Sequence, residues 1–197
     1  MSDESRGPES PPQRPRPSLE RFLPGDPTPR QQVDRMLRVD HAGEYGARRI
    51  YEGQLAVLGR SPSAGTIREM HAQEARHLEA FDRLLVERRV RPTLLTPVWH
   101  VAGFALGAAT ALLGEKAAMA CTAAVEEVID RHYADQAEAL GGGEPAVKAL
   151  IEEFRADEAE HRDTAIEQGA EQAPAYDLLS GAIKAGSRLA IWLSTRI

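Results

Sequence analysis

The sequence predicts an all-α fold built on a bundle of four helices. Four stretches of similar length repeat apolar residues about every 3.6 positions, which is the period of an α-helix. Glycine and proline clusters separate these stretches, and no convincing strand lies between them. At 197 residues the chain is long enough to bury one core, so we expect one helical domain preceded by a tail.

The tail is expected at residues 1–30 and the folded domain at residues 31–197. The tail holds most of the prolines and carries acidic residues without an apolar run, so it matches neither a signal peptide nor a transit peptide. We expect it to be disordered and solvated. The first helix follows these prolines and runs through Gly59, while Gly43 and Gly46 interrupt its pattern and require a local reason.

Turn residues bound the other three helices of the predicted bundle. Residues 61–63 form a turn that supplies a capping residue for the second helix, and that helix ends near Arg89. The third helix is expected at residues 115–140 and stops at the three glycines of residues 141–143. The fourth begins at a Glu-Pro pair, a good helix start, and covers residues 145–168.

Two further segments are apolar and stand apart from the four helices. Residues 92–114 contain no Asp, Glu, Lys or Arg, but proline and glycine interrupt them too often for a membrane-spanning helix. We expect this segment to be buried or to lie at an interface. Residues 175–197 are apolar as well, and every charged residue after Asp177 is basic.

The composition excludes several classes of function. A formal net charge of −6 and a low aromatic content argue against nucleic acid as a partner, because phosphate binding needs a basic face. The single cysteine, Cys121, rules out an intrachain disulfide and a thiolate zinc cluster. It fits a reducing compartment such as the cytoplasm.

A short motif, Glu-x-x-His, occurs once on the second helix and once on the fourth. Its members are Glu74 and His77 in the first copy and Glu158 and His161 in the second. Positions i and i+3 share a helix face, so each pair can present one carboxylate and one imidazole to the same point. One such pair would be weak support, because glutamate and histidine often meet by chance.

The spacing strengthens the interpretation. A glutamate in a stretch of small or apolar residues precedes each pair by one helix: Glu44 precedes Glu74 by 30 residues, and Glu126 precedes Glu158 by 32. The chain therefore resembles two helical hairpins of one design that face each other. Glu127 is an alternative to Glu126, but Glu126 shares a helix face with apolar neighbours and is favoured.

The predicted inward groups are four carboxylates and two imidazoles. Four carboxylates cannot all stay ionised in a core of low dielectric unless cations neutralise them, and two divalent metals would do so. Oxygen-rich sites with one imidazole per metal suit iron or manganese. This ligand set is typical of ferritin-like di-iron and di-manganese proteins. The alternative is that these side chains form salt bridges on exposed helix faces.

Several segments resemble the demethoxyubiquinone hydroxylase family of ubiquinone biosynthesis. The resemblance covers residues 32–197 and is carried by VDHAGEYGA, QEARHLEAF, ACTAAVEEVIDRHY, DEAEH and AIKAGSRLAIWLSTRI. It implies a di-iron monooxygenase that hydroxylates the ring of a polyprenyl methoxy-methyl-benzoquinol with dioxygen. It also implies two iron ions per chain and an external reductant, NADH. The iron ligands that it implies are Glu44, Glu74, His77, Glu126, Glu158 and His161, with Glu74 and Glu158 bridging.

Neighbours of these ligands are candidates for further roles. His132 and Tyr133 follow Glu126 by one to two turns and could position the quinol or relay electrons and protons, or they could simply pack. Asp157 could hydrogen-bond a ligand imidazole from another helix. Tyr45 and Cys121 are expected in the core.

A polyprenyl substrate must be taken from a bilayer, which gives the two apolar segments a role. Trp99 and Trp192 suit a membrane interface, and Lys184 and Arg188 suit anionic headgroups. We therefore expect membrane-facing helical segments at residues 92–114 and 175–197, although the two could instead pack on each other. The expected location is peripheral, on the cytoplasmic face of a bacterial inner membrane, with a lipid-binding accessory protein or a biosynthetic complex as further partner.

Two rival functions share the predicted ligand set. One is a ferritin-like di-metal oxidase or peroxidase, and the other is an iron-storage protein. Storage requires a cage with polar channels for iron, and the uncharged segment of residues 92–114 disfavours it.

Overall fold

The computed structural model describes residues 25–197, which fold into helices joined by short turns. The helices in chain order are α1 (Pro29–Leu58), α2 (Ala64–Arg88), α3 (Thr96–Leu112), α4 (Glu115–Leu140), α5 (Pro145–Glu167), the short 3-10 helix η1 (Ala170–Gln172) and α6 (Tyr176–Ser194). The described range contains no strand, as predicted. Most of the predicted tail lies outside the described residues.

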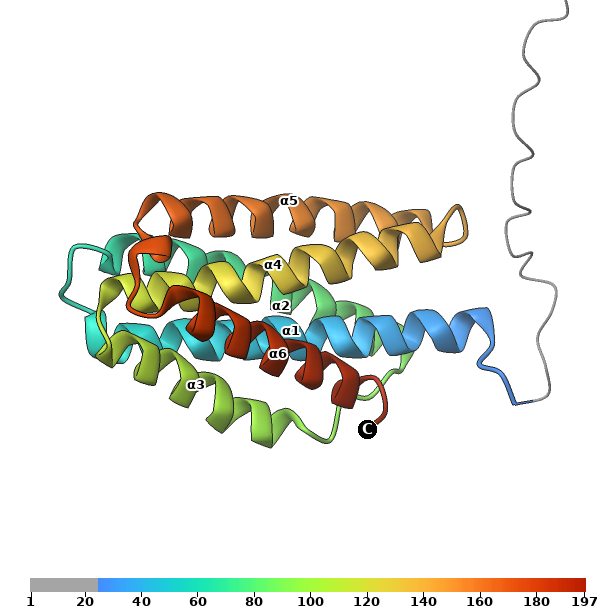
Figure 1. Ribbon diagram of the computed structural model, residues 1–197. Coiled ribbons are helices and arrows are strands. Elements are labelled where there is room, and N and C mark those ends of the chain that lie inside the picture. Colours follow the sequence, from blue (N-terminus) through green and yellow to red (C-terminus); the bar gives the residue numbers. More distant parts are fainter. Residues whose placement is uncertain (1–24) are drawn as a thin grey trace, which may run out of the picture.

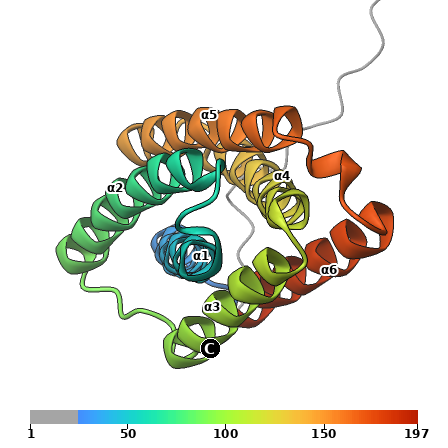
Figure 2. The same ribbon diagram turned by 90° about the vertical axis from the view of Figure 1, so that its left-hand side faces the viewer.

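Four long helices form the bundle and two helices cover one side of it. The hairpins α1–α2 and α4–α5 lie against each other, and α3 and α6 lie on the side formed by α1 and α4 (Figure 1). The end-on view shows α2 and α5 on the opposite side of the bundle (Figure 2). The two segments predicted to stand apart from the bundle are thus its outer pair of helices.

The helix ends follow the predicted signals with one exception. Thr28 and Gln31 form a capping box at the start of α1, and Pro145 opens α5. Arg89 ends α2 in the left-handed conformation. Ser63 occupies the N-cap position of α2, as predicted, but its side chain makes no capping bond. Its own backbone N–H instead donates to the carboxylate of Glu115 at 3.0 Å, which joins the turn to α4.

Glycine allows α1 and α3 to touch through their backbones. A Cβ atom on Gly107 would lie 1.9 Å from the carbonyl oxygen of Ile50, and one on Gly53 would lie 2.2 Å from that of Phe104. No larger residue fits at either position, so α3 is held firmly against α1. Close helix packing does not explain the glycines at positions 43 and 46, because a Cβ atom on Gly43 or Gly46 would meet nothing within 4 Å.

The core is apolar at both ends of the bundle and polar in its middle. Leu37, Phe81 and Ile151 are fully buried in the cluster at one end, and Ile67 and Met119 are buried in the cluster at the other. Burial of this kind is the main term that stabilises such a bundle.

Within residues 25–197, no helix combines the length and the apolar character needed to cross a bilayer.

Candidate metal centre

Six buried side chains from four helices meet in the middle of the bundle. They are the six predicted ligands: Glu44 from α1, Glu74 and His77 from α2, Glu126 from α4, and Glu158 and His161 from α5. Each is at most 2% exposed. Charged residues are rarely buried this fully unless they are paired or bind a metal, so this arrangement differs from that of an exposed salt-bridging face.

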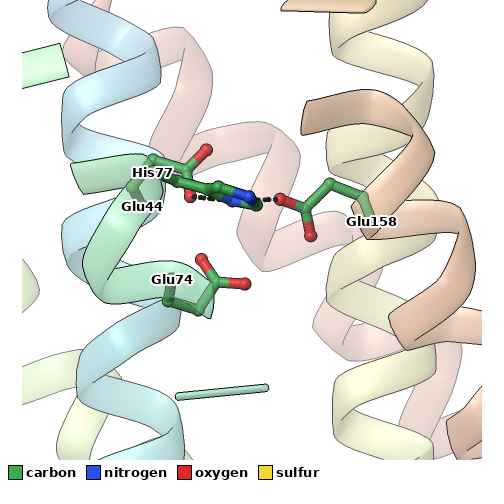
Figure 3. A group of neighbouring side chains, drawn as sticks. All are labelled: Glu44, Glu74, His77 and Glu158. Carbon is green, nitrogen blue, oxygen red and sulfur yellow. Dashed lines mark ion pairs between the residues drawn. The ribbon is translucent and has the colours of Figure 1, made fainter. Parts of the chain in front are cut away.

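Both imidazoles turn their Nδ1 atoms toward two carboxylates, at least one of which comes from another helix. Nδ1 of His77 lies 3.2 Å from Glu158 and 3.5 Å from Glu44, and Figure 3 shows the ring between these two groups. Nδ1 of His161 lies 3.2 Å from Glu74 and 3.4 Å from Glu158. The helical hairpins therefore contribute to one common cluster.

The cluster divides into two groups that share two members. Within Glu44, Glu74, His77 and Glu158, one possible ligand atom from each lies within 4.8 Å of the others, and the same is true within Glu74, Glu126, Glu158 and His161. Glu74 and Glu158 belong to both groups. Two ions held in these groups would have Glu74 and Glu158 between them.

The atoms that face the cluster centre lack hydrogen-bond partners among the described residues. They are Oε2 of Glu44, both carboxylate oxygens of Glu74 and of Glu158, Oε2 of Glu126, and Nδ1 of His77 and of His161. A buried polar atom without a partner is costly, and so many at one point call for a group that binds them together. Oxygen-rich donors with one imidazole on each side suit iron or manganese, so the residues present fit a di-metal site.

The electrostatics of the cluster show the same demand for positive charge. Burial, reinforced by the charge of Glu158, raises the pKa of Glu74 well above its usual range, and burial does the same for Glu126. Burial alone would lower the pKa of His77, but the nearby carboxylates of Glu158 and Glu44 raise it to about 10. Burial alone would raise the pKa of Glu158, but the nearby imidazoles of His161 and His77 lower it to about 2. The raised pKa values of Glu74, Glu126 and His77 favour their protonated forms, which reduces the net negative charge that is buried.

The outer nitrogen of each imidazole is held by a polar side chain. Nε2 of His77 lies 2.9 Å from Asp157, the contact predicted for that aspartate, and Nε2 of His161 lies 2.7 Å from Oε1 of Gln73. Such partners fix the tautomer and the orientation of a ligating histidine.

Two tyrosine hydroxyls bond carboxylates of the cluster. Tyr51 donates to Glu126 at 2.7 Å, and Tyr133 donates to Glu44. Tyr133 was singled out in the sequence, whereas Tyr51 and Gln73 were not. Gln73 directly precedes the first Glu-x-x-His pair, just as Asp157 precedes the second, so its position was the available signal.

The structure separates several other candidates from the cluster. Glu127 lies on the outside of α4 and pairs with Lys184 at 2.6 Å, which leaves Glu126 as the inward carboxylate. Cys121 is buried, as predicted. The prediction of a core position for Tyr45 is wrong: its ring is half-exposed, and its hydroxyl lies 2.6 Å from Nδ1 of His100 on α3. His132 belongs to neither metal-sized group, and its Nε2 lies 3.3 Å from Asp40.

An apolar cavity of about 340 Å³ lies beside the cluster, between α1, α4 and the outer helices α3 and α6. Gly43 and Ala47, which flank Glu44, form part of its inner wall together with Val125, the neighbour of Glu126. The open space over Gly43 and Gly46 belongs to this cavity. No charged residue lines it.

Fold and site together define a helical-bundle protein with a buried carboxylate–histidine cluster suited to metal. The model of one protein family, described as ubiquinone biosynthesis protein COQ7, matches residues 31–194. The chain belongs to this family.

Characterised relatives cover most of the chain. It is 63% identical over 183 residues to the 3-demethoxyubiquinol 3-hydroxylase of Rhodospirillum rubrum, which spans 92% of this chain and 86% of the relative. It is 54% identical to the mitochondrial NADPH-dependent 3-demethoxyubiquinone 3-hydroxylases of Bos taurus and Homo sapiens. These two alignments each span 85% of this chain and 79% of the relative.

Proposed function

We propose that this chain is a ferritin-like di-iron monooxygenase that hydroxylates the ring of a polyprenyl methoxy-methyl-benzoquinol in ubiquinone biosynthesis. The observation that carries the proposal is the buried cluster of four carboxylates and two imidazoles, found in a chain whose relatives are named for this hydroxylation. The ring gains one oxygen atom from dioxygen, the other leaves as water, and two electrons and two protons are consumed.

Each group of the cluster would hold one iron ion. Glu44 and His77 would bind the first, Glu126 and His161 the second, and Glu74 and Glu158 both. When bound, two ferrous ions supply two electrons to dioxygen, a step that the protein side chains cannot perform.

The protein's own residues would orient these ligands and keep water away. Asp157 and Gln73 fix the imidazole rings through their outer nitrogens, and the hydroxyls of Tyr51 and Tyr133 fix one carboxylate on each side. Holding ligands in place before the reaction lowers the cost of reorganisation during it. Because every cluster residue is buried, the site is also shielded from side reactions with solvent.

The apolar cavity is the proposed place for the quinol. Its lining is apolar or small, which suits an isoprenoid chain, and its inner wall reaches the residues beside Glu44 and Glu126. Helix α4 would form one wall of the path, because it begins at the end of α3 and carries Glu126 in its middle. A site for oxidising iron or peroxide needs no such cavity, so this feature favours a hydroxylase over its rivals.

The outer helices are the proposed membrane-facing surface. Val101 on α3 and Leu189 and Trp192 on α6 are more than half exposed, at 66%, 56% and 51%. Exposed apolar groups of this density mark a surface for lipid or protein. Arg188 remains a candidate for anionic headgroups, whereas Lys184 is already paired with Glu127. We place the protein peripherally on the cytoplasmic face of a bacterial inner membrane, in contact with a lipid-binding accessory protein or a biosynthetic complex.

Isotope labelling tests the proposed reaction. The iron-loaded protein is supplied with a short-tailed methoxy-methyl-benzoquinol, ¹⁸O-labelled dioxygen and a reduced nicotinamide. NADH and NADPH are compared, because the sequence resemblance implied NADH and the mammalian relatives are named for NADPH. We expect the product to gain one labelled oxygen atom. Oxygen derived from water, or oxidation of the quinol without gain of an atom, would favour an oxidase or peroxidase instead.

A further inference from the structure

The proposed reaction consumes two protons for each dioxygen, and the apolar cavity offers no group to carry them. Its lining contains no charged residue, and a quinol seated there would also block water. Protons must therefore reach the buried cluster by another way. The same need holds for any reduction of dioxygen at this site, so the inference rests on the proposed function only in part.

A buried aspartate outside the cluster is the centre of a second polar network. The side chain of Asp40 is fully buried, and one of its oxygens, Oδ1, lies 2.7 Å from Nε2 of Gln136 and 3.3 Å from Nε2 of His132. Nε2 of Gln136 also lies 2.8 Å from Nε2 of His132, to which its amide N–H donates. The second oxygen, Oδ2, is buried and has no hydrogen-bond partner among residues 25–197. This network of α1 and α4 has no part in holding the proposed ligands.

The network forms the inner end of a separate pocket that opens to water. This pocket measures about 380 Å³, and its lining includes His132, Gln136, Gln32, Arg35 and Asp135. Unlike the apolar cavity, it has charged residues in its lining, and Val39 is the one residue that lines both. The side chain of His132 is 23% exposed, whereas that of Asp40 is completely covered. His132 therefore stands between the pocket and Asp40.

Asp40 is also close to the metal cluster along α1. It precedes Glu44 by one helical turn and shares its face of α1. Burial raises the pKa of Asp40 above its usual value. The contact with His132 partly offsets this rise, and the charge of Glu44 adds to it. The charge of Asp40 in turn acts on Tyr133, which bonds Glu44. Asp40 is thus electrostatically linked to the pocket on one side and to the cluster on the other.

The remaining ionisable groups near Asp40 face elsewhere. His41, the next residue along α1, turns to α2 and lies 3.0 Å from Asp82. Arg35 and Asp135 line the outer part of the pocket.

We propose that His132 and Asp40 relay protons from this aqueous pocket to the metal cluster, with Gln136 as the residue that positions them. His132 takes a proton from pocket water on its imidazole and, once charged, passes a proton to Oδ1 of Asp40, which lies 3.3 Å from its Nε2. Asp40 releases a proton from Oδ2 toward the side of Glu44, and His132 returns to its neutral form. Two such transfers per dioxygen match the two electrons that the reduced nicotinamide supplies. Quinol and protons then approach the cluster through different openings.

Asp40→Asn and His132→Gln test the relay, because both substitutions keep size and polarity but remove the proton-carrying group. Asp34→Asn is the matched control, since Asp34 is a partly buried aspartate on the same helix that pairs with Arg88 and Arg30. Iron content, thermal unfolding, oxygen uptake, kcat and KM for a short-tailed quinol, and the kinetic effect of D₂O are measured for each full-length, iron-loaded variant.

We expect both relay variants to keep two irons per chain and a KM within about twofold of the unmodified protein. Their kcat should fall by about tenfold or more, the loss typical of a missing acid–base group. The kinetic effect of D₂O should increase, and a larger share of the electrons from the reductant should reduce dioxygen to hydrogen peroxide. Unchanged kcat and D₂O effect in both variants would overturn the relay, as would iron loss in proportion to activity or an equal effect of Asp34→Asn.

Oxygen uptake and histidine NMR keep this test separate from that of the hydroxylation. If the unmodified protein reduces dioxygen without hydroxylating the quinol, the hydroxylase proposal fails, but the D₂O effect on oxygen uptake still reports the relay. In the metal-free protein, ¹⁵N NMR of labelled histidine should show a changed Nε2 resonance of His132 in Asp40→Asn. An unchanged resonance would mean that the contact is absent in solution, and the relay would be rejected.

Discussion

The four carboxylates of the cluster are not equivalent. Glu74 and Glu158 each belong to both metal-sized groups, whereas Glu44 and Glu126 each belong to one. All four are buried, so the difference lies in position along the cluster and not in access to solvent. Loss of a shared carboxylate removes a donor from both groups at once, and loss of an outer one removes a donor from a single group.

This difference predicts unequal metal loss. Glu74→Ala and Glu158→Ala should each lose most of the two irons that the anaerobically purified protein is expected to hold. Glu126→Ala should retain about one, because the group of Glu44 and His77 stays complete. Glu127→Ala is the matched control and should keep both, since Glu127 pairs with Lys184 outside the cluster. Metal analysis of the four variants decides the matter, and full retention in both Glu74→Ala and Glu158→Ala would rule out a shared role.

The sequence was sufficient to predict the cluster residues but not all of their supports. The Glu-x-x-His motif occurs twice, each time with a glutamate one helix earlier. This repetition indicates two similar hairpins that face each other, so six buried residues could be named. Tyr51 could not, because a tyrosine on a helix carries no pattern that reveals its partner, and Gln73 was overlooked although it precedes its Glu-x-x-His pair as Asp157 does. Tyr45 shows the opposite error: it was expected in the core, but it follows Glu44 directly, and neighbouring helix positions differ by about 100° in direction.

At the scale of the elements, the bundle was predictable and the placement of α3 was not. The breaks around residues 61–63 and 141–143 gave the helix boundaries to within a few residues. The glycines of α3 were taken as interruptions, yet Gly107 is where the backbone of α3 meets that of α1. A close backbone approach depends on the partner helix, so the sequence of one segment does not show it. What the sequence did show, an uncharged outer segment, agrees with the exposed apolar side chains of α3.

The outer face of α6 leads to a prediction about lipid binding. Leu189→Glu and Trp192→Glu should each reduce recovery of the protein with anionic vesicles in flotation, by about tenfold in the partition coefficient, because burying one such side chain contributes about 1.5–3 kcal/mol. Helicity should not change, since both side chains are already exposed. Val86→Glu is the control, because Val86 is exposed on α2, away from this face. Equal flotation of all three variants would show that α6 does not face the membrane.

For the whole molecule, the cluster joins metal binding to folding. Each of the four bundle helices contributes at least one of the six side chains. The six side chains therefore come together only when all four helices are packed. Burying four carboxylates without cations is unfavourable, and bound metal removes that cost. The free energy of metal binding therefore adds to the stability of the fold.

The pKa shifts fix how this linkage depends on pH. The pKa of His77 is raised to about 10, so its contribution to stability is complete below its unfolded value of 6.5 and is lost as the pH rises toward 10. The pKa values of Glu74 and Glu126 are also raised, so the metal-free fold is weakened as these groups lose protons at rising pH. Glu158, with a pKa of about 2, stabilises the fold above its unfolded value and contributes no slope between pH 5.5 and 8. The slopes that His77, Glu74 and Glu126 contribute in this window have the same sign.

We therefore predict that the metal-free protein becomes less stable from pH 5.5 to pH 8, while metal protects it increasingly. Ligands must lose protons to bind, so metal affinity rises over the same window. With ferrous or manganous ion at about a hundred times its Kd, the Tm should increase by roughly 5–10 °C at pH 8. The gain should be clearly smaller at pH 5.5. Anaerobic thermal unfolding of both forms at the two pH values measures the difference, with the double variant Glu74→Ala/Glu158→Ala as the control that shows no gain at either. A gain that stayed constant or shrank with rising pH would mean that the cluster protons and the metal do not compete for the same atoms.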